Sequence, residues 1–83
     1  MTREEAYGIL NPIFRDLFDD ETITVNDETT AADVDGWDSF EHVNLLLEIE
    51  NAFGFAFSIN ETRNMKNVGE MVDLILKKTD RKE

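Results

Sequence analysis

The 83-residue sequence contains no cysteine, and this absence excludes several kinds of chemistry. Disulfide bridges, thiolate metal ligands and a protein-borne thiol nucleophile all need that side chain, so any thioester chemistry would require a sulfur atom from outside. Long apolar runs are also missing: the longest, such as Leu45–Leu47, has three residues, whereas a membrane-spanning helix needs about 20. No signal peptide is apparent at the N-terminus. We expect one cytoplasmic domain, residues 1–83, that does not enter a membrane.

Basic side chains are absent from the middle of the sequence. Between residues 16 and 62 there are thirteen acidic residues and no lysine or arginine, whereas the flanks together carry a charge of +2. Nucleic acid, itself a polyanion, is a poor partner for such a surface. Proteins with basic patches are suitable partners, because opposite fields steer their encounter. An equally good interpretation is that the acids only keep a small protein in solution.

Hydrophobic spacing predicts an all-α fold with three main helices and one short one. The main helices are expected over residues 3–18 and 38–53, and from Asn67 to the basic pair Lys77 and Lys78. A short helical turn is expected over residues 59–65, capped by Asn60. These elements predict a small antiparallel helical bundle with a long first connection.

The first helix and the connection after it each raise a question. Pro12 removes a hydrogen bond and crowds the preceding turn, so we expect a kink there, or a restart of the helix with Asn11 as its cap. A structureless loop as long as residues 19–37 is uncommon unless it is functional or held in place. Its apolar residues could hold it on the core; they are Ile23, Val25, Val34 and Trp37.

The helix over residues 38–53 carries two apolar stripes. Asp38, followed three places later by Glu41, resembles a capping box at its start. One stripe, predicted to face the core, comprises His42, Leu45, Leu46, Ile49 and Phe53. The opposite stripe comprises Phe40, Val43 and Leu47. Because a bundle helix needs only one apolar stripe, the second either lies under another segment, such as the long connection, or docks a partner.

Catalysis and metal binding find little support in the sequence. Asp38, Ser39 and His42 are the residue types of a hydrolase triad, but their positions on one helix prevent the relay between them. In residues 33–36, Asp-Val-Asp-Gly, the glycine follows the first aspartate by three places, whereas a calcium loop needs five. His42 is expected to be a packed, hydrogen-bonded side chain rather than a ligand. We therefore predict no catalytic residue and no metal site.

Ser39 stands at the first position of the expected second helix. A phosphate ester on its oxygen would be stabilised by unpaired N–H groups and the helix dipole, although serine is common at helix starts without any such role. Residues 36–40, GWDSF, resemble the G-x-D-S-L attachment motif of acyl carrier proteins. The segment SFEHVNLLLEIENAFG is similar to the family's D-S-L-x-x-V-E-L-x-x-x-L-E-x-x-F pattern, and residues 66–75 resemble its final helix.

The resemblance implies a carrier protein that is not an enzyme. A phosphopantetheinyl transferase would move phosphopantetheine from coenzyme A onto Ser39, and the thiol of that arm would carry acyl thioesters in fatty acid or polyketide biosynthesis. Gly36 would allow the turn before the helix, and Asp38 would cap it. The chain would act as a monomer whose partners, acyl-loading and acyl-transfer enzymes, have basic patches. The docking residues that the resemblance implies are Phe40, Glu41, Val43, Leu47, Glu48 and Glu50.

Three positions depart from the commonest fatty-acid carriers. Phe40 replaces a leucine, Asn44 stands where those carriers have a glutamate, and Ile59 falls where they often have an acid. These departures favour a specialised carrier over the housekeeping one. The aspartate before Ser39 favours acyl cargo, since peptidyl carriers often have histidine there. Two alternatives stay open: a peptidyl or aminoacyl carrier, and an acidic helical adaptor that binds a basic protein without a cofactor.

Overall fold

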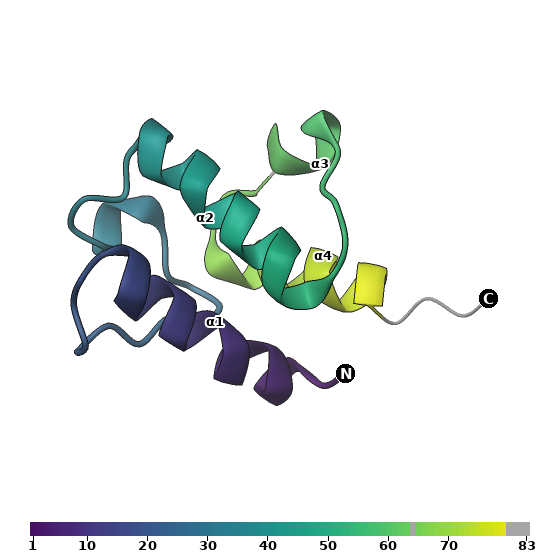
Figure 1. Cartoon of the computed structure of the whole chain (residues 1–83), viewed down its shortest axis with the longest axis horizontal. Helices are drawn as coiled ribbons and strands as arrows, with labels where there is room; N and C mark the ends of the chain where they lie inside the picture. Colours follow the sequence, from purple (N-terminus) through teal and green to yellow (C-terminus); the bar gives the residue numbers. More distant parts are fainter. Residues whose placement is uncertain (64, 80–83) are drawn as a thin grey trace.

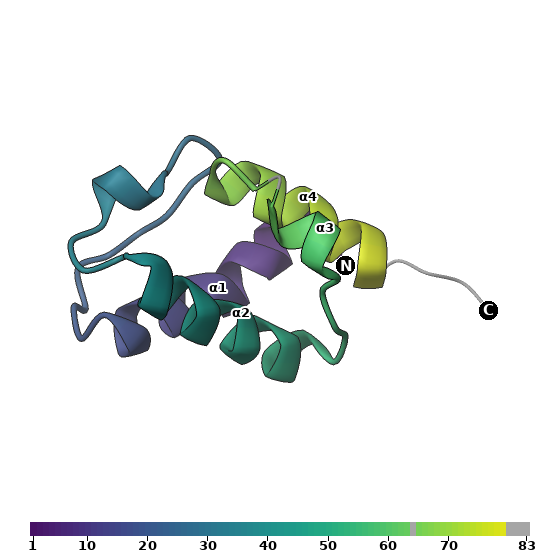
Figure 2. The ribbon, with the colours of Figure 1, turned by 90° about the horizontal axis from the view of Figure 1, so that it is seen from above.

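A computed structural model describes residues 1–63 and 65–79, and its helices pack as a bundle (Figure 1). Helix α1 runs antiparallel to both α2 and α4, and the long connection crosses one end of the bundle (Figures 1 and 2). Across the described ranges there is no strand, which confirms the predicted all-α fold of three main helices and one short one. The elements are α1 Arg3–Leu17, η1 Ala31–Asp33 (a 3₁₀ turn), α2 Ser39–Phe53, α3 Ile59–Arg63 and α4 Val68–Thr79.

Helix α1 begins as its sequence predicts but continues through its proline. Thr2 Oγ1 accepts from the Glu5 N–H at 3.1 Å while Glu5 Oε1 accepts from the Thr2 N–H at 2.8 Å, a complete capping box. Of the two alternatives at Pro12, the restart with Asn11 as its cap is wrong, because Pro12 lies inside a helix that runs without a break from Arg3 to Leu17. Because Pro12 has no N–H, the Gly8 carbonyl four residues earlier loses its helical hydrogen-bond partner. Both residues lie on the exposed side of the helix, where water can bond to that oxygen. Asn11 instead accepts from the Val25 N–H, at 2.8 Å.

The core lies where α1, α2 and α4 meet. Its side chains occupy the inward stripe of each helix, and burying each of the large ones contributes about 1.5–3 kcal/mol. Val25 and Val34 of the long connection are also buried, and Ile23 and Trp37 pack against the core, so the connection is held as predicted. The fully or almost fully buried helix residues are Ala6, Leu10, Phe14, Leu45, Ile49, Val68, Met71, Val72 and Ile75.

The long connection is also bonded to the start of α4. The Val68 N–H donates to the Thr29 carbonyl at 2.8 Å, and the Gly69 N–H donates to the Asp27 carbonyl at 3.1 Å. These two N–H groups have no partner within their own helix, so the connection satisfies them. A Cβ atom at Gly69 would stand 2.7 Å from the Asp27 carbonyl oxygen, which explains why only glycine fits there.

A charged network ties α1, the connection and α4 together. The Arg3 guanidinium contacts Asp27 at 2.9 Å and Asp73 at 2.6 Å, and it also donates to the Gly69 carbonyl at 3.1 Å. The Tyr7 hydroxyl donates to the same Asp27 carboxylate. Contact with Arg3, and then with Tyr7, holds the pKa of Asp27 below its ordinary value. Asp27 therefore fixes the connection to α1 through its side chain and to α4 through its carbonyl.

Replacing Asp27 with asparagine is expected to lower the free energy of unfolding at neutral pH but much less in acid. Because the folded state lowers the pKa of Asp27, its contribution is complete above the unfolded-state pKa, about 3.9, and is lost as the pH falls through the folded pKa. Thermal melts of both proteins from about pH 7 to about pH 2 measure the difference. Glu28→Gln, which removes the same charge from an exposed neighbour that forms no ion pair in the described residues, is the control; an Asp27→Asn effect independent of pH would contradict the expected result.

Between α2 and α4, the prediction that Asn60 caps the short helix is wrong. Gly54 ends α2, as expected, and the chain then turns back along the core. Asn60 lies inside α3 and does not cap it; the cap is Ser58, whose Oγ accepts from the Glu61 N–H at 3.2 Å while Glu61 Oε1 accepts from the Ser58 N–H at 2.8 Å. Asn67, where the last main helix is expected to begin, caps α4 by accepting from the Glu70 N–H at 2.8 Å.

Candidate functional site

Ser39 is the first residue of α2, and its side chain is exposed. Across the described residues its hydroxyl makes no hydrogen bond, so it is free for other chemistry. Asp38 caps the helix, its Oδ1 accepting from the Glu41 N–H at 2.9 Å. The predicted capping box is only half formed, since Glu41 Oε1 accepts from the Asn44 amide at 3.2 Å instead of turning back to Asp38. The hydroxyl thus lies beside first-turn N–H groups at the positive end of α2.

The chain makes a tight turn immediately before Ser39. The Trp37 N–H donates to the Val34 carbonyl at 3.2 Å, and the Asp38 N–H donates to the Gly36 carbonyl at 3.0 Å. Gly36 has a φ of +87°, a left-handed conformation that side-chain-bearing residues rarely adopt. The space around it is not the constraint, because an added Cβ would lie 3.7 Å from the Phe18 ring. Glycine is needed here for its backbone conformation, which directs the chain into α2.

His42 packs against Trp37, which lies two residues before Ser39. The Trp37 indole Nε1–H donates to His42 Nδ1 at 3.1 Å, and the two ring planes are inclined by 20° with centroids 5.9 Å apart. Burial lowers the pKa of His42, which favours the neutral imidazole. The prediction that His42 is a packed, hydrogen-bonded side chain is confirmed. Among residues 1–63 and 65–79, no group of three histidine, aspartate or glutamate side chains is arranged to hold a metal ion.

The second apolar stripe of α2 faces outward. Phe40 is 72% exposed, Val43 57% and Leu47 52%, so the long connection does not cover them and that alternative is wrong. Ile59, at the start of α3, is also exposed, by 72%. Isolated exposed apolar side chains are ordinary, but a row of three on one helix face leaves an apolar surface without an internal partner. We call Phe40, Val43 and Leu47 the outer stripe.

The acidic residues of α2 differ in what surrounds them. Glu48 is exposed and lines a hollow together with Pro12 and Leu17 of α1, and Glu41 is partly exposed and bonded to Asn44. Glu50 lies differently: its Oε2 accepts from the Phe57 N–H at 2.7 Å, so its carboxylate holds the segment between α2 and α3. The sequence could not show this, since the contact depends on how the chain turns after α2.

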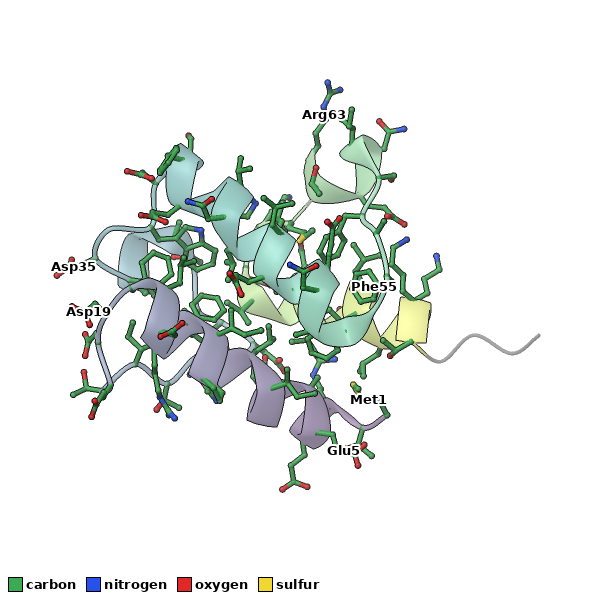
Figure 3. All side chains as sticks on the ribbon, in the orientation of Figure 1. Met1, Glu5, Asp19, Asp35, Phe55 and Arg63 are labelled. Atoms are coloured by element: carbon green, nitrogen blue, oxygen red, sulfur yellow. The ribbon has the colours of Figure 1, made fainter. Side chains whose placement is uncertain are left out.

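The acidic stretch remains largely uncompensated in the folded protein. Of its thirteen acids, Asp27 pairs with Arg3 and Glu61 pairs with Lys78 at 3.0 Å; the other eleven form no ion pair in the described part of the chain. Figure 3 shows Asp19 and Asp35 pointing outward at the same end of the molecule. The end of the bundle that carries Ser39 is therefore strongly negative, which favours a basic partner surface.

Comparison with known proteins identifies the family. Models of known protein families give no match. An acyl carrier protein of Coprothermobacter proteolyticus is 34% identical over 80 residues, covering 90% of this chain and 92% of that protein. The solution NMR structure of a holo acyl carrier protein from Geobacter metallireducens superposes with a TM-score of 0.86 at 42% identity, covering 92% of this chain and 87% of that one.

The helical bundle and these similarities define a carrier protein rather than an enzyme. The chain belongs to the acyl carrier protein family. Phosphopantetheine is the prosthetic group of that family, so membership identifies the cofactor that this fold carries. The described helices include none with the length and apolar character of a membrane span.

Proposed function

We propose that this protein carries acyl groups as thioesters on a phosphopantetheine arm attached to Ser39 Oγ. The observation that supports this most is the exposed hydroxyl, without a hydrogen-bond partner in the described structure, at the first position of α2. In the transfer, Ser39 Oγ forms a bond to the phosphorus that bears the pantetheine arm, the pyrophosphate bond of coenzyme A breaks, and adenosine 3′,5′-bisphosphate leaves. The hydroxyl proton passes to a base of the transferase.

The resulting phosphodiester suits its surroundings at the helix start. Its negative charge would stand beside first-turn N–H groups and the positive end of the helix dipole, which stabilise anions. The arm's terminal thiol then supplies the sulfur that this cysteine-free chain lacks. Gly36 and Asp38 support the site indirectly, because the first sets the turn before α2 and the second caps the helix.

Incubating the native chain with coenzyme A and a broad-specificity phosphopantetheinyl transferase tests the attachment. Intact-mass spectrometry should show the addition of a single phosphopantetheine, and peptide mapping should place it on the peptide that contains Ser39. Acyl loading should then add the mass of one acyl group, removable by hydroxylamine, which cleaves thioesters. Absence of any addition to the folded native chain would overturn the proposal.

We propose the outer stripe and its neighbouring acids as the surface that meets partner enzymes. Phe40 and Leu47 would fill shallow apolar pockets, while Val43 would lie nearer the acyl chain. Glu41 and Glu48 would pair with arginine and lysine on basic patches. Each exposed pair contributes only about 0.2–1 kcal/mol, which suits a carrier that must dissociate after each transfer. Glu50, engaged with the Phe57 N–H, is better explained as a structural residue.

Reversing the charge of Glu48 is expected to raise the KM of the transferase for the carrier by about fivefold, the effect of losing about 1 kcal/mol of pairing. Glu48→Lys is the test variant, and Glu21→Lys is its matched control, since Glu21 is also an exposed acid and lies on the long connection. Both variants change the net charge equally, so only the place of the change differs. Equal rises in KM would show a general charge effect and would contradict docking through α2.

The docking surface also supports a specialised carrier. Ile59 is 72% exposed, and Asn44 donates to Glu41, so the two departures make this surface less acidic and more apolar than that of the commonest fatty-acid carriers. We propose a cytoplasmic, monomeric carrier of acyl rather than peptidyl cargo, formed by residues 1–83 as one domain. Comparing the rates of loading by fatty-acid, polyketide and aminoacyl-loading enzymes would identify its pathway class.

A further inference from the structure

Within the described residues, the segment 36–39 has one side-chain hydrogen bond to the bundle besides the helix cap. Trp37 stands two residues before Ser39, and its indole N–H donates to His42 Nδ1, one turn into α2. The indole also packs edge-on against the fully buried Phe14 ring, with centroids 5.2 Å apart, and against Phe18 at 6.2 Å. Trp37 thus links the turn before Ser39 to the core and to α2 at once.

We infer that the Trp37–His42 hydrogen bond is a clamp that positions residues 36–39 for modification, and that protonation of His42 opens it. The positioning role of the clamp rests on the proposed attachment at Ser39. The chemistry follows from the atoms: Nδ1 accepts from Trp37, so the neutral ring carries its proton on Nε2. When the ring is protonated, Nδ1 becomes a donor facing another donor, and the hydrogen bond is lost.

The charged groups around His42 come from two elements. Asp38 caps the helix that carries His42 and Glu41 lies in its first turn, and their negative charge favours the imidazolium. On the connection between α3 and α4, Lys66 lines the same small cavity of about 70 Å³, and its positive charge opposes it. The other cavity residues, among them Ala31 and Met71, carry no charge. Burial lowers the pKa of His42, so the clamp is closed near neutral pH and opens only below the ordinary pKa of histidine, about 6.5.

Nuclear magnetic resonance on the unmodified chain tests the clamp independently of the proposed function. The sequence has one histidine and one tryptophan, so both ring signals are unambiguous. We expect the Nε2–H tautomer of His42 at about pH 7.5 and an indole N–H shift of Trp37 that titrates with the same midpoint as His42, below about 6.5. An Nδ1–H tautomer, or an indole signal that does not follow His42, would overturn the clamp.

Two variants test whether the clamp positions Ser39. In His42→Asn the side-chain oxygen can replace Nδ1 as an acceptor but does not titrate, whereas His42→Phe keeps a ring without an acceptor. The measured quantity is kcat/KM for phosphopantetheine addition, as the ratio of wild type to His42→Asn at each pH, so that the transferase's own pH dependence cancels. We expect a ratio near one at about pH 7.5 that falls about fivefold at a pH well below the His42 midpoint measured by resonance. The kcat/KM of His42→Phe should be about fivefold below that of His42→Asn at every pH.

Circular dichroism at each pH confirms that wild type and variants are folded when they are assayed. A ratio that stays constant across the pH range, with all proteins folded, would overturn the positioning role. If the native chain is never modified, the proposed attachment fails, while the resonance experiment still decides whether the clamp exists. The two failures are therefore distinguishable.

Discussion

Alanine at position 39 is expected to abolish phosphopantetheine addition, because the esterified oxygen is then missing. The chain has only one other serine, Ser58, and its Oγ is occupied as the cap of α3. Intact-mass spectrometry after incubation with coenzyme A and the transferase should show the unmodified mass alone. Since the Ser39 hydroxyl is exposed and makes no hydrogen bond in the described structure, its removal should change the free energy of unfolding by no more than about 0.5 kcal/mol.

Ser58→Ala is the matched control, since it makes the same chemical change at the other serine. It should keep the full mass addition, although losing the α3 cap costs about 0.5–2 kcal/mol of stability. Mass addition to Ser39→Ala would contradict the proposed site. The adaptor alternative, which needs no cofactor, predicts that Ser39→Ala retains both partner binding and cellular function, so complementation with this variant separates a carrier from an adaptor.

The helices could be predicted from the sequence because their determinants are local. Thr2, Asp38 and Asn67 each cap the helix that follows, and each cap involves an N–H only three residues away. The spacing of apolar residues likewise places the buried face of each helix without knowledge of its neighbours. Ser39 at the start of α2 follows from this local pattern, and so does its exposure.

The contacts between distant residues could not be predicted in the same way. Arg3 meets Asp27, which is 24 residues away, and Glu50 holds the Phe57 N–H only because the chain turns back after Gly54. Helical periodicity shows which face a residue occupies but not what covers that face, so the outer stripe stayed ambiguous. The helix does not restart at Pro12, because the intrinsic preference of proline is weaker than the packing of the α1 core stripe, which keeps the helix continuous.

The largest stability effect is expected at Phe14, where alanine should lower the free energy of unfolding by about 3–5 kcal/mol. Phe14 is fully buried between α1 and the rest of the core, and its ring supports Trp37 edge-on. Replacing the Phe14 ring with a methyl group would both leave a cavity in the core and remove the aromatic contact with Trp37. Small domains are stable by only about 5–15 kcal/mol, so Phe14→Ala should unfold at much lower urea concentration than wild type.

Phe40→Ala is the matched comparison, because it makes the same change on a ring that is 72% exposed. Folding removes little apolar area from water at Phe40, so Phe40→Ala should change the free energy of unfolding by no more than about 0.5 kcal/mol. If Phe40 instead serves partner docking, its loss should raise the KM of partner enzymes while the urea midpoint stays constant. Comparable destabilisation of the two variants would show that Phe40 belongs to the folding core, and the outer stripe could then no longer be assigned to partners.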